Sequence, residues 1–133
     1  SSLIARSLPY DQRTAYEGKK RIPGTALNAK IDITHPLAFG LQAKLYTLKF
    51  GTDALVPNVG LETVGSYEKF NQLNAAGYAS PDNLGHLAEN TFAGVVSLGR
   101  GKVVYLIDNT QYRMFWMGPS RMMQNAVMQI PGY

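Results

Sequence analysis

Apolar and polar positions alternate along the first half of the chain. The first alternation covers residues 25–33, has one apolar face and predicts a half-buried strand. His35-Pro36 follows it and should end it, because proline cannot donate to a strand ladder. A second alternation over 46–50 stops at Gly51, and a weaker one lies at 59–63. These patterns predict three strands before residue 66.

The last third of the chain has the clearest pattern. Residues 92–98 predict a strand, Gly99-Arg100-Gly101-Lys102 predicts a tight turn, and the continuous apolar run 103–107 predicts a strand covered on both faces. The two strands should form a hairpin. A final helix is expected near 119–129, because apolar residues recur at spacings of three and four: Met122, Met123, Ala126, Val127 and Ile130.

A short helix is predicted near 81–89. Ser80 supplies a hydroxyl cap, Pro81 fits the first turn, and Asp82 places an acid near the positive end of the helix. Residues 1–22 have no sustained period and are interpreted as an irregular basic arm. Residues 23–133 are interpreted as a single α/β domain, a mixed unit with about four or five strands.

Composition supports a folded domain. The chain has 133 residues, of which 45% are hydrophobic and 17% charged, a balance that can build a core and argues against disorder. It contains no cysteine, which excludes disulfides and cysteine-based metal sites. It has no apolar run near the roughly 20 residues that a membrane span needs.

The net charge of +4 is unevenly distributed. Residues 1–30 hold six bases and two acids, whereas residues 31–133 hold seven of each. The excess therefore belongs to the N-terminal segment, and the folded part lacks the basic stripe expected of a nucleic-acid binder. No nucleic-acid partner is predicted.

Two histidines stand near acids at spacings that can carry chemistry. His86 and Glu89 have the H-x-x-E spacing of some zinc peptidases, but the third ligand is missing, so an exposed helix face is the favoured interpretation. Asp32 and His35 resemble part of a catalytic dyad without a nucleophile, and a structural histidine bonded to backbone is favoured. We predict no metal site and no catalytic residue. His35 is kept as a ligand candidate.

The remaining candidates lie in the last quarter of the chain. Asp108 ends a predicted strand, where it can bind a ligand or cap the next helix, and both interpretations stay open. Arg113 and Trp116, followed by Arg121 and Asn125, form a segment rich in residue types favoured at interfaces. A core role for Trp116 explains the pattern equally well, so interface and core also stay open.

Three stretches together resemble a known family. They are Arg21-Ile22-Pro23-Gly24 running into the segment 32–40 (DITHPLAFG), the segment 99–109, and the segment 112–126 with its FW-x-G-x-x-R-x-x-x-NA pattern. This order resembles the C-terminal end of large bacterial zinc-carboxypeptidase-like proteins. In that family, a carboxypeptidase A-type catalytic domain precedes a domain similar to class I glutamine amidotransferases. The resemblance covers about residues 21–128.

The resemblance implies a fold and a role. The chain would be the later part of a flavodoxin-like domain, and the zinc ligands would belong to the parent's catalytic domain, so no cofactor is expected in this chain. Its function would be accessory, with the upstream peptidase domain as partner and a periplasmic or secreted location. The alternatives are a binding module for a small ligand or cell-wall peptide near His35 and Asp108, or an independent hydrolase or amidotransferase. An exposed apolar patch would favour the accessory role, and a polar pocket at Asp108 the binding role.

Overall fold

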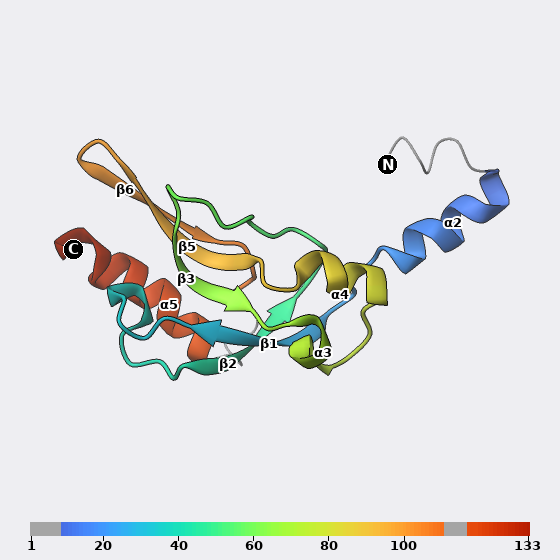
Figure 1. The fold of residues 1–133 in the computed structure, drawn as a ribbon, viewed down its shortest axis with the longest axis horizontal. Coiled ribbons are helices and arrows are strands. Elements are labelled where there is room, and N and C mark those ends of the chain that lie inside the picture. Colours follow the sequence, from blue (N-terminus) through green and yellow to red (C-terminus); the bar gives the residue numbers. More distant parts are fainter. Residues whose placement is uncertain (1–8, 111–116) are drawn as a thin grey trace.

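A computed structural model describes residues 9–110 and 117–133, and its centre is an antiparallel sheet (Figure 1). The strands are β1 (Thr25–Ile31), β2 (Lys44–Lys49), β3 (Glu62–Tyr67), β4 (Asn74–Ala76), β5 (Thr91–Leu98) and β6 (Gly101–Leu106). Their order is β2-β1-β3-β5-β6, with β4 paired to β1. All pairs between the described strands are antiparallel.

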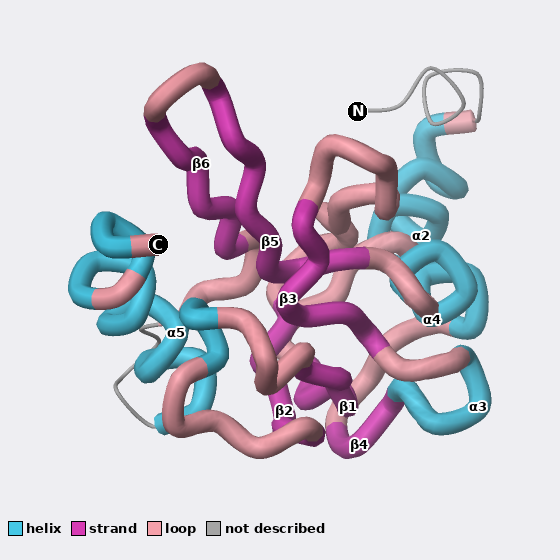
Figure 2. Tube along the Cα trace, turned by 60° about the vertical axis from the view of Figure 1, so that its left-hand side comes forward, coloured by secondary structure: helices cyan, strands magenta, loops and turns pink. Residues whose placement is uncertain are grey.

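Helices lie at both ends of this sheet (Figure 2). They are α2 (Tyr10–Lys19), α3 (Phe70–Leu73), α4 (Pro81–Leu87) and α5 (Met117–Met128), with short 3₁₀ turns η1 (Pro36–Ala38) and η3 (Ile130–Gly132). α3 and α4 lie at one end, whereas α5 lies at the other and packs on η1 and β2. The mixed α/β class is confirmed. The flavodoxin-like assignment, which requires a parallel sheet, finds no support in these antiparallel pairs.

β1 and β2, the strands predicted from the first two alternating patterns, turn different residue types toward the core. On β1 the predicted apolar face is buried: Leu27 and Ala29 are at most 1% exposed. On β2 the polar positions Thr47 and Lys49 face inward and are at most 1% exposed, whereas Tyr46 is 57% exposed. The second strand is therefore present as predicted, but its outward face is the apolar one.

The C-terminal hairpin is confirmed. β5 and β6 pair in regular register from Ala93–Leu106 to Leu98–Gly101, which leaves the two-residue turn Gly99-Arg100. Gly99 has φ +59°, which suits the first central position of a type II′ turn. The expectation that β6 is covered on both faces is wrong, because β6 is the last strand of the described sheet and none of its residues is fully buried.

The two predicted helices are present with changes. Ser80 caps α4 by accepting a hydrogen bond from the Asn83 N–H, as expected, but the helix ends at Leu87. On α5, Met122 is buried and Ala126 packs against the core, whereas Met123 and Val127 of the predicted stripe are exposed. The polar Asn125 takes a buried position on this helix instead.

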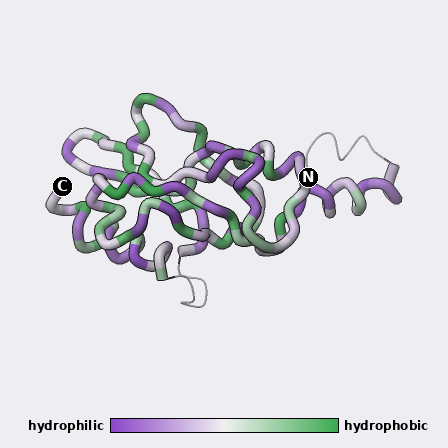
Figure 3. The backbone as a smooth tube through the Cα atoms, turned by 60° about the horizontal axis from the view of Figure 1, so that its bottom comes forward, coloured by the Kyte–Doolittle hydropathy of each residue, from purple (hydrophilic) through white to green (hydrophobic). Residues whose placement is uncertain are grey.

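The N-terminal segment is not irregular throughout. Residues Tyr10–Lys19 form α2, ten residues with no buried side chain. α2 is largely hydrophilic and points away from the sheet (Figure 3). Asp11 at its start and Lys19 at its end match the helix dipole. A helix can therefore form here without an apolar period along the segment.

Candidate functional site

A buried polar network surrounds Asp108. Its Oδ1 accepts hydrogen bonds from Lys49 Nζ at 2.9 Å and from the Tyr67 hydroxyl at 2.7 Å, while Oδ2 accepts one from the Thr47 hydroxyl at 2.7 Å. Lys49 Nζ also donates to the backbone carbonyl of Asp53. The Lys49 and Asp108 side chains are each 1% exposed. All polar atoms of this carboxylate are therefore occupied by the protein itself.

The network joins the two ends of the sheet. Asp108 follows β6, whereas Thr47 and Lys49 lie on β2, at the opposite end of the strand order. Burial raises the pKa of Tyr67 far above its ordinary value, and the charge of Asp108 adds to this, so the phenol stays protonated as a donor. Asp108 thereby links β2 and β3 to the segment that follows β6. Ligand binding and helix capping, the two roles predicted for it, stay predictions.

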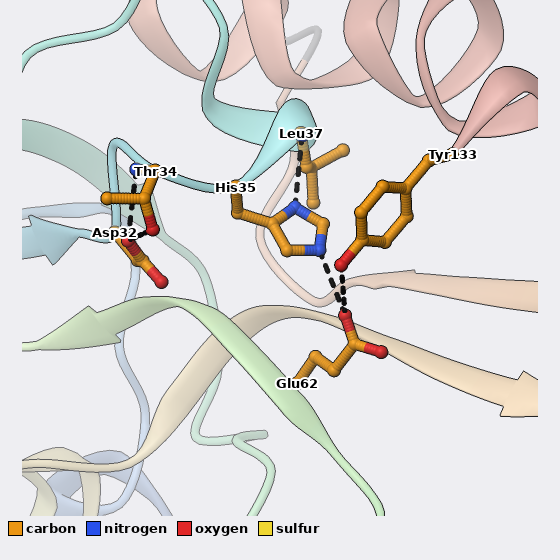
Figure 4. Close-up of polar contacts among 6 residues, drawn as sticks. All are labelled: Asp32, Thr34, His35, Leu37, Glu62 and Tyr133. Carbon is orange, nitrogen blue, oxygen red and sulfur yellow. Dashed lines mark hydrogen bonds and ion pairs between the residues drawn. The ribbon is translucent and has the colours of Figure 1, made fainter.

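His35 belongs to a second, partly exposed cluster (Figure 4). Its Nδ1 accepts a hydrogen bond from the Leu37 N–H at 3.1 Å, so the proton of the neutral ring is on Nε2. Nε2 donates to Glu62 Oε2 at 3.1 Å, and the Tyr133 hydroxyl donates to the same oxygen at 3.2 Å. The rings of His35 and Tyr133 meet edge to face at 5.0 Å. The predicted backbone-bonded histidine is confirmed.

Hydrogen bonds and charges around His35 shift the pKa values of the neighbouring side chains. The hydrogen bond from His35 holds the pKa of Glu62 below its ordinary value, assisted by Tyr133 and the nearby charge of Lys102. The hydrogen bond to Glu62 raises the pKa of the Tyr133 phenol. Asp32 is bonded separately, through Oδ1, to the backbone N–H and the hydroxyl of Thr34, which lowers the pKa of that carboxyl. Asp32 and His35 therefore form no dyad.

Beside this cluster lies a cleft of about 300 Å³ between the β5–β6 hairpin and the C-terminal turns. Lys102 Nζ lies 4.0 Å from the centre of the Tyr133 ring, and Arg100 lines the same cleft. Val104, Ala126 and Ile130 contribute apolar surface. The cleft offers two cations, one aromatic ring and an apolar wall.

The two described candidates on α5 have different roles. Asn125 is buried, and its Nδ2 donates to the carbonyls of Leu37 at 2.9 Å and Phe39 at 2.8 Å. It thereby fastens η1 to α5. Arg121 is exposed, and its guanidinium lies close to Gly40, where a Cβ would come within 3.3 Å of it. The other two candidates, Arg113 and Trp116, lie outside the described residues.

His86 and Glu89, which have the spacing of a zinc motif in the sequence, do not lie on one helix in the structure. His86 lies in the last turn of α4, whereas Glu89 follows the end of the helix with a positive φ of 61°. The two residues therefore do not share a helix face, and the favoured exposed-face interpretation is wrong on this point. Among the described residues, no three histidines and acids gather as a metal-binding group. No described helix is long and apolar enough to cross a membrane.

Sequence reasoning missed most partners in both clusters. Lys49 and Tyr67 reach Asp108 across 59 and 41 residues, and Glu62 and Tyr133 are 71 residues apart. One signal was available: Thr47 and Lys49 repeat at the spacing of one strand face. A lysine inside that repeat can mark a buried ion pair as well as a solvated face.

Comparison with known proteins identifies no relative. No protein-family model matches the sequence, and neither a curated protein nor a solved structure matches it.

Proposed function

We propose that this chain is a non-catalytic accessory domain of a larger exported zinc carboxypeptidase-like protein, and that it packs against the peptidase domain. The proposal starts from the three stretches that resemble this family. Zinc would be held by the parent's catalytic domain, with a periplasmic or secreted location. The flavodoxin-like part of the proposal then requires that any parallel strands come from outside this chain.

The exposed apolar face of α5 is the observation that carries the proposal. Met117, Met123, Val127 and Met128 are 82%, 42%, 63% and 75% exposed. Met123 and Val127 lie one turn apart and continue the apolar stripe that Met122 and Ala126 begin. Methionine-rich helix faces adapt well to protein partners. A helix that leaves this much apolar surface in water is typical of an interaction site.

The polar residues support the same role. The side chain of Asp108 is hydrogen-bonded to Lys49 of the sheet, and the side chain of Asn125 is hydrogen-bonded to backbone carbonyls at η1. His35 uses both ring nitrogens within the protein. Among the described residues, every buried side-chain nitrogen and oxygen has a partner. Such groups stabilise a scaffold and are not poised for acid–base or nucleophilic chemistry.

The proposal is tested by co-purification with the peptidase domain encoded by the same gene. Val127→Asp places a charge on the exposed face of α5 and should weaken the complex by about tenfold or more, because a desolvated charge at an interface is unfavourable. Val59→Asp is the matched control, since Val59 is fully exposed on a loop. Equal binding by wild type and Val127→Asp, or no binding by wild type, would refute the proposal.

The second candidate function is binding of a small ligand or cell-wall peptide. The cleft lined by Arg100, Lys102 and Tyr133 favours it, because two cations beside an aromatic ring suit a peptide with a free carboxylate. Its volume, about 300 Å³, is at the lower end for ligand sites. Titration with a short carboxylate-ended cell-wall peptide, followed by NMR shifts at these residues, distinguishes it from the accessory role.

A further inference from the structure

The sheet face that points away from the core carries a row of three side chains, Tyr46, Asn28 and Glu68. Tyr46 on β2 pairs with Asn28 on β1. On the other side of Asn28, its carbonyl accepts a hydrogen bond from the N–H of Glu68, which directly follows β3. Thr47 and Tyr67, the sequence neighbours of two of these residues, are fully buried. Because side chains alternate along a strand, the row lies on the opposite face of the sheet.

Glu68 is a largely buried carboxylate within this row. Its side chain is 10% exposed, and its ion pair with Lys30 spans 4.0 Å between Nζ and Oε2, which exceeds hydrogen-bond length. Among the described residues, no side chain donates a hydrogen bond to it. The carboxylate lines a hollow of about 180 Å³ together with Asn28, Lys44 and Gln72. Buried polar groups normally have hydrogen-bond partners, so this carboxylate is an available acceptor for a ligand.

The charges around the hollow disfavour ionic ligands of either sign. Glu68 opposes an anion, because a like charge beside a largely desolvated carboxylate is unfavourable. Lys30 and Lys44, which pair across β1 and β2, oppose a cation in the same way. A neutral ligand with several hydroxyl groups meets neither penalty, because each hydroxyl can donate to the carboxylate or accept from an ammonium.

Tyr46 supplies an aromatic surface next to the hollow. It is 57% exposed. It stands two strand spacings, roughly 10 Å, from Glu68. The hollow is smaller than an ordinary ligand pocket, so it accommodates one unit of a ligand whose next unit extends toward Tyr46. A sugar ring suits both places, because it combines hydroxyl groups with an apolar face of C–H groups that packs on an aromatic ring.

We propose that this row is a binding site for a neutral oligosaccharide. One sugar unit places its hydroxyls at Glu68 and at the amide of Asn28, whose Nδ2 already donates to the Gln72 carbonyl at 2.8 Å. A neighbouring unit packs on the ring of Tyr46. The hollow shares no lining residue with the cleft beside Tyr133, and no residue of α5 lines it. The site therefore goes beyond the proposed accessory function and stands without it.

NMR titration of the labelled chain with chitotetraose and with maltotetraose, two neutral tetrasaccharides, tests the site. At least one of them should shift the amide signals of Asn28, Tyr46 and Glu68. Tyr46→Ala should weaken this binding by about tenfold, because the aromatic contact is lost. Tyr10→Ala is the matched control, since Tyr10 is 85% exposed on α2. No shift with either sugar, or shifts confined to the cleft beside Tyr133, overturns the proposal.

Replacing Glu68 with glutamine separates a sugar from a nucleic acid. Glu68→Gln keeps the size of the side chain and should weaken sugar binding by about fivefold, because hydrogen bonds to a charged acceptor are stronger. A single-stranded oligothymidylate would instead bind this variant more tightly than wild type, since a charge that repels phosphates is gone. Glu89→Gln, at an exposed position after α4, is the matched control. Sugar binding that is unchanged in both Glu68→Gln and Tyr46→Ala overturns the proposal, as does oligothymidylate binding to this row more tightly than either sugar.

Discussion

Lys49 and Asp108 illustrate what a buried charge needs in order to persist. Removing either ion from water costs several kcal/mol, and a single salt bridge seldom offsets this. Here the carboxylate receives three hydrogen bonds and the ammonium also donates to the Asp53 carbonyl. Each ion therefore has more than one hydrogen-bond partner, and the pair links β2 to the segment that follows β6.

Replacing Asp108 with alanine should destabilise the chain strongly. The substitution leaves the Lys49 ammonium buried without a counter-ion, which typically costs about 3–5 kcal/mol, a large share of a small domain's stability. The free energy of unfolding from urea denaturation measures this loss. The double variant Lys49→Met/Asp108→Leu should recover part of it, because no buried charge remains. If Asp108→Ala is as stable as wild type, the contacts of Asp108 with Lys49 do not stabilise the fold.

Single residues were predicted least well where their partners are distant in sequence. The backbone bond of His35 was anticipated because it involves Leu37, two residues away. Its Glu62 and Tyr133 contacts depend on the packing of strands and turns that no local pattern encodes. Asp108 was located correctly at a strand end, but a carboxylate there can face a ligand or the core. Only the three-dimensional placement of Lys49 decides between these two.

Helices and strands were predicted better than their faces. The hairpin of β5 and β6 and the cap of α4 follow from short-range chemistry: Gly99 in the turn, and Ser80 before Pro81. The inward face of β2 did not follow, because Lys49 reaches a buried partner. On α5 the apolar residues cover more of the circumference than the core needs, and Asn125 occupies part of the inner face. Hydrophobic period alone therefore indicates that an element is amphipathic but does not determine its buried side.

The bond between α5 and η1 gives a test of how the elements are joined. Asn125→Leu leaves the carbonyls of Leu37 and Phe39 without their donor and should cost about 1–3 kcal/mol, the usual penalty for buried unsatisfied groups. Thermal melts measure it. Gln124→Leu is the matched control, because Gln124 is the exposed neighbour on the same helix. If the melting temperature falls equally in both variants, the cause is the introduced leucine and not the lost hydrogen bonds.

Viewed as a whole, the described part of the molecule has a centre whose buried polar groups are hydrogen-bonded, and an exposed apolar surface on α5. The central core contains Leu27, Tyr67 and Phe92, all fully buried. α5, which carries the exposed apolar residues Met117, Met123, Val127 and Met128, lies at the opposite end of the molecule from α2 (Figure 1). A partner bound to this face of α5 therefore need not contact α2. The basic segment and the proposed interface are separate regions of the chain.

This separation predicts the outcome of removing residues 1–20. α2 buries no side chain, and one of its links to the body is the hydrogen bond from Asn83 Nδ2 to the Lys19 carbonyl at 3.2 Å. Losing that bond should cost about 1 kcal/mol, so the shortened chain should stay folded. The cut must precede Ile22, which is 2% exposed and whose carbonyl accepts from the Gly51 N–H.

The same deletion should abolish any retention on heparin at low salt. Residues 1–20 hold four bases and two acids, so the net charge falls from +4 to +2. Lys69→Gln/Arg100→Gln removes the same two charges from exposed positions on the folded body and is the matched control. Heparin elution should move far more in the deletion than in this control, because Lys19 and Lys20 form a run of three adjacent cations with Arg21, whereas Lys69 and Arg100 are far apart in the sequence. Equal elution would show that net charge alone governs retention, and unchanged retention of the shortened chain would locate a basic surface on the folded domain.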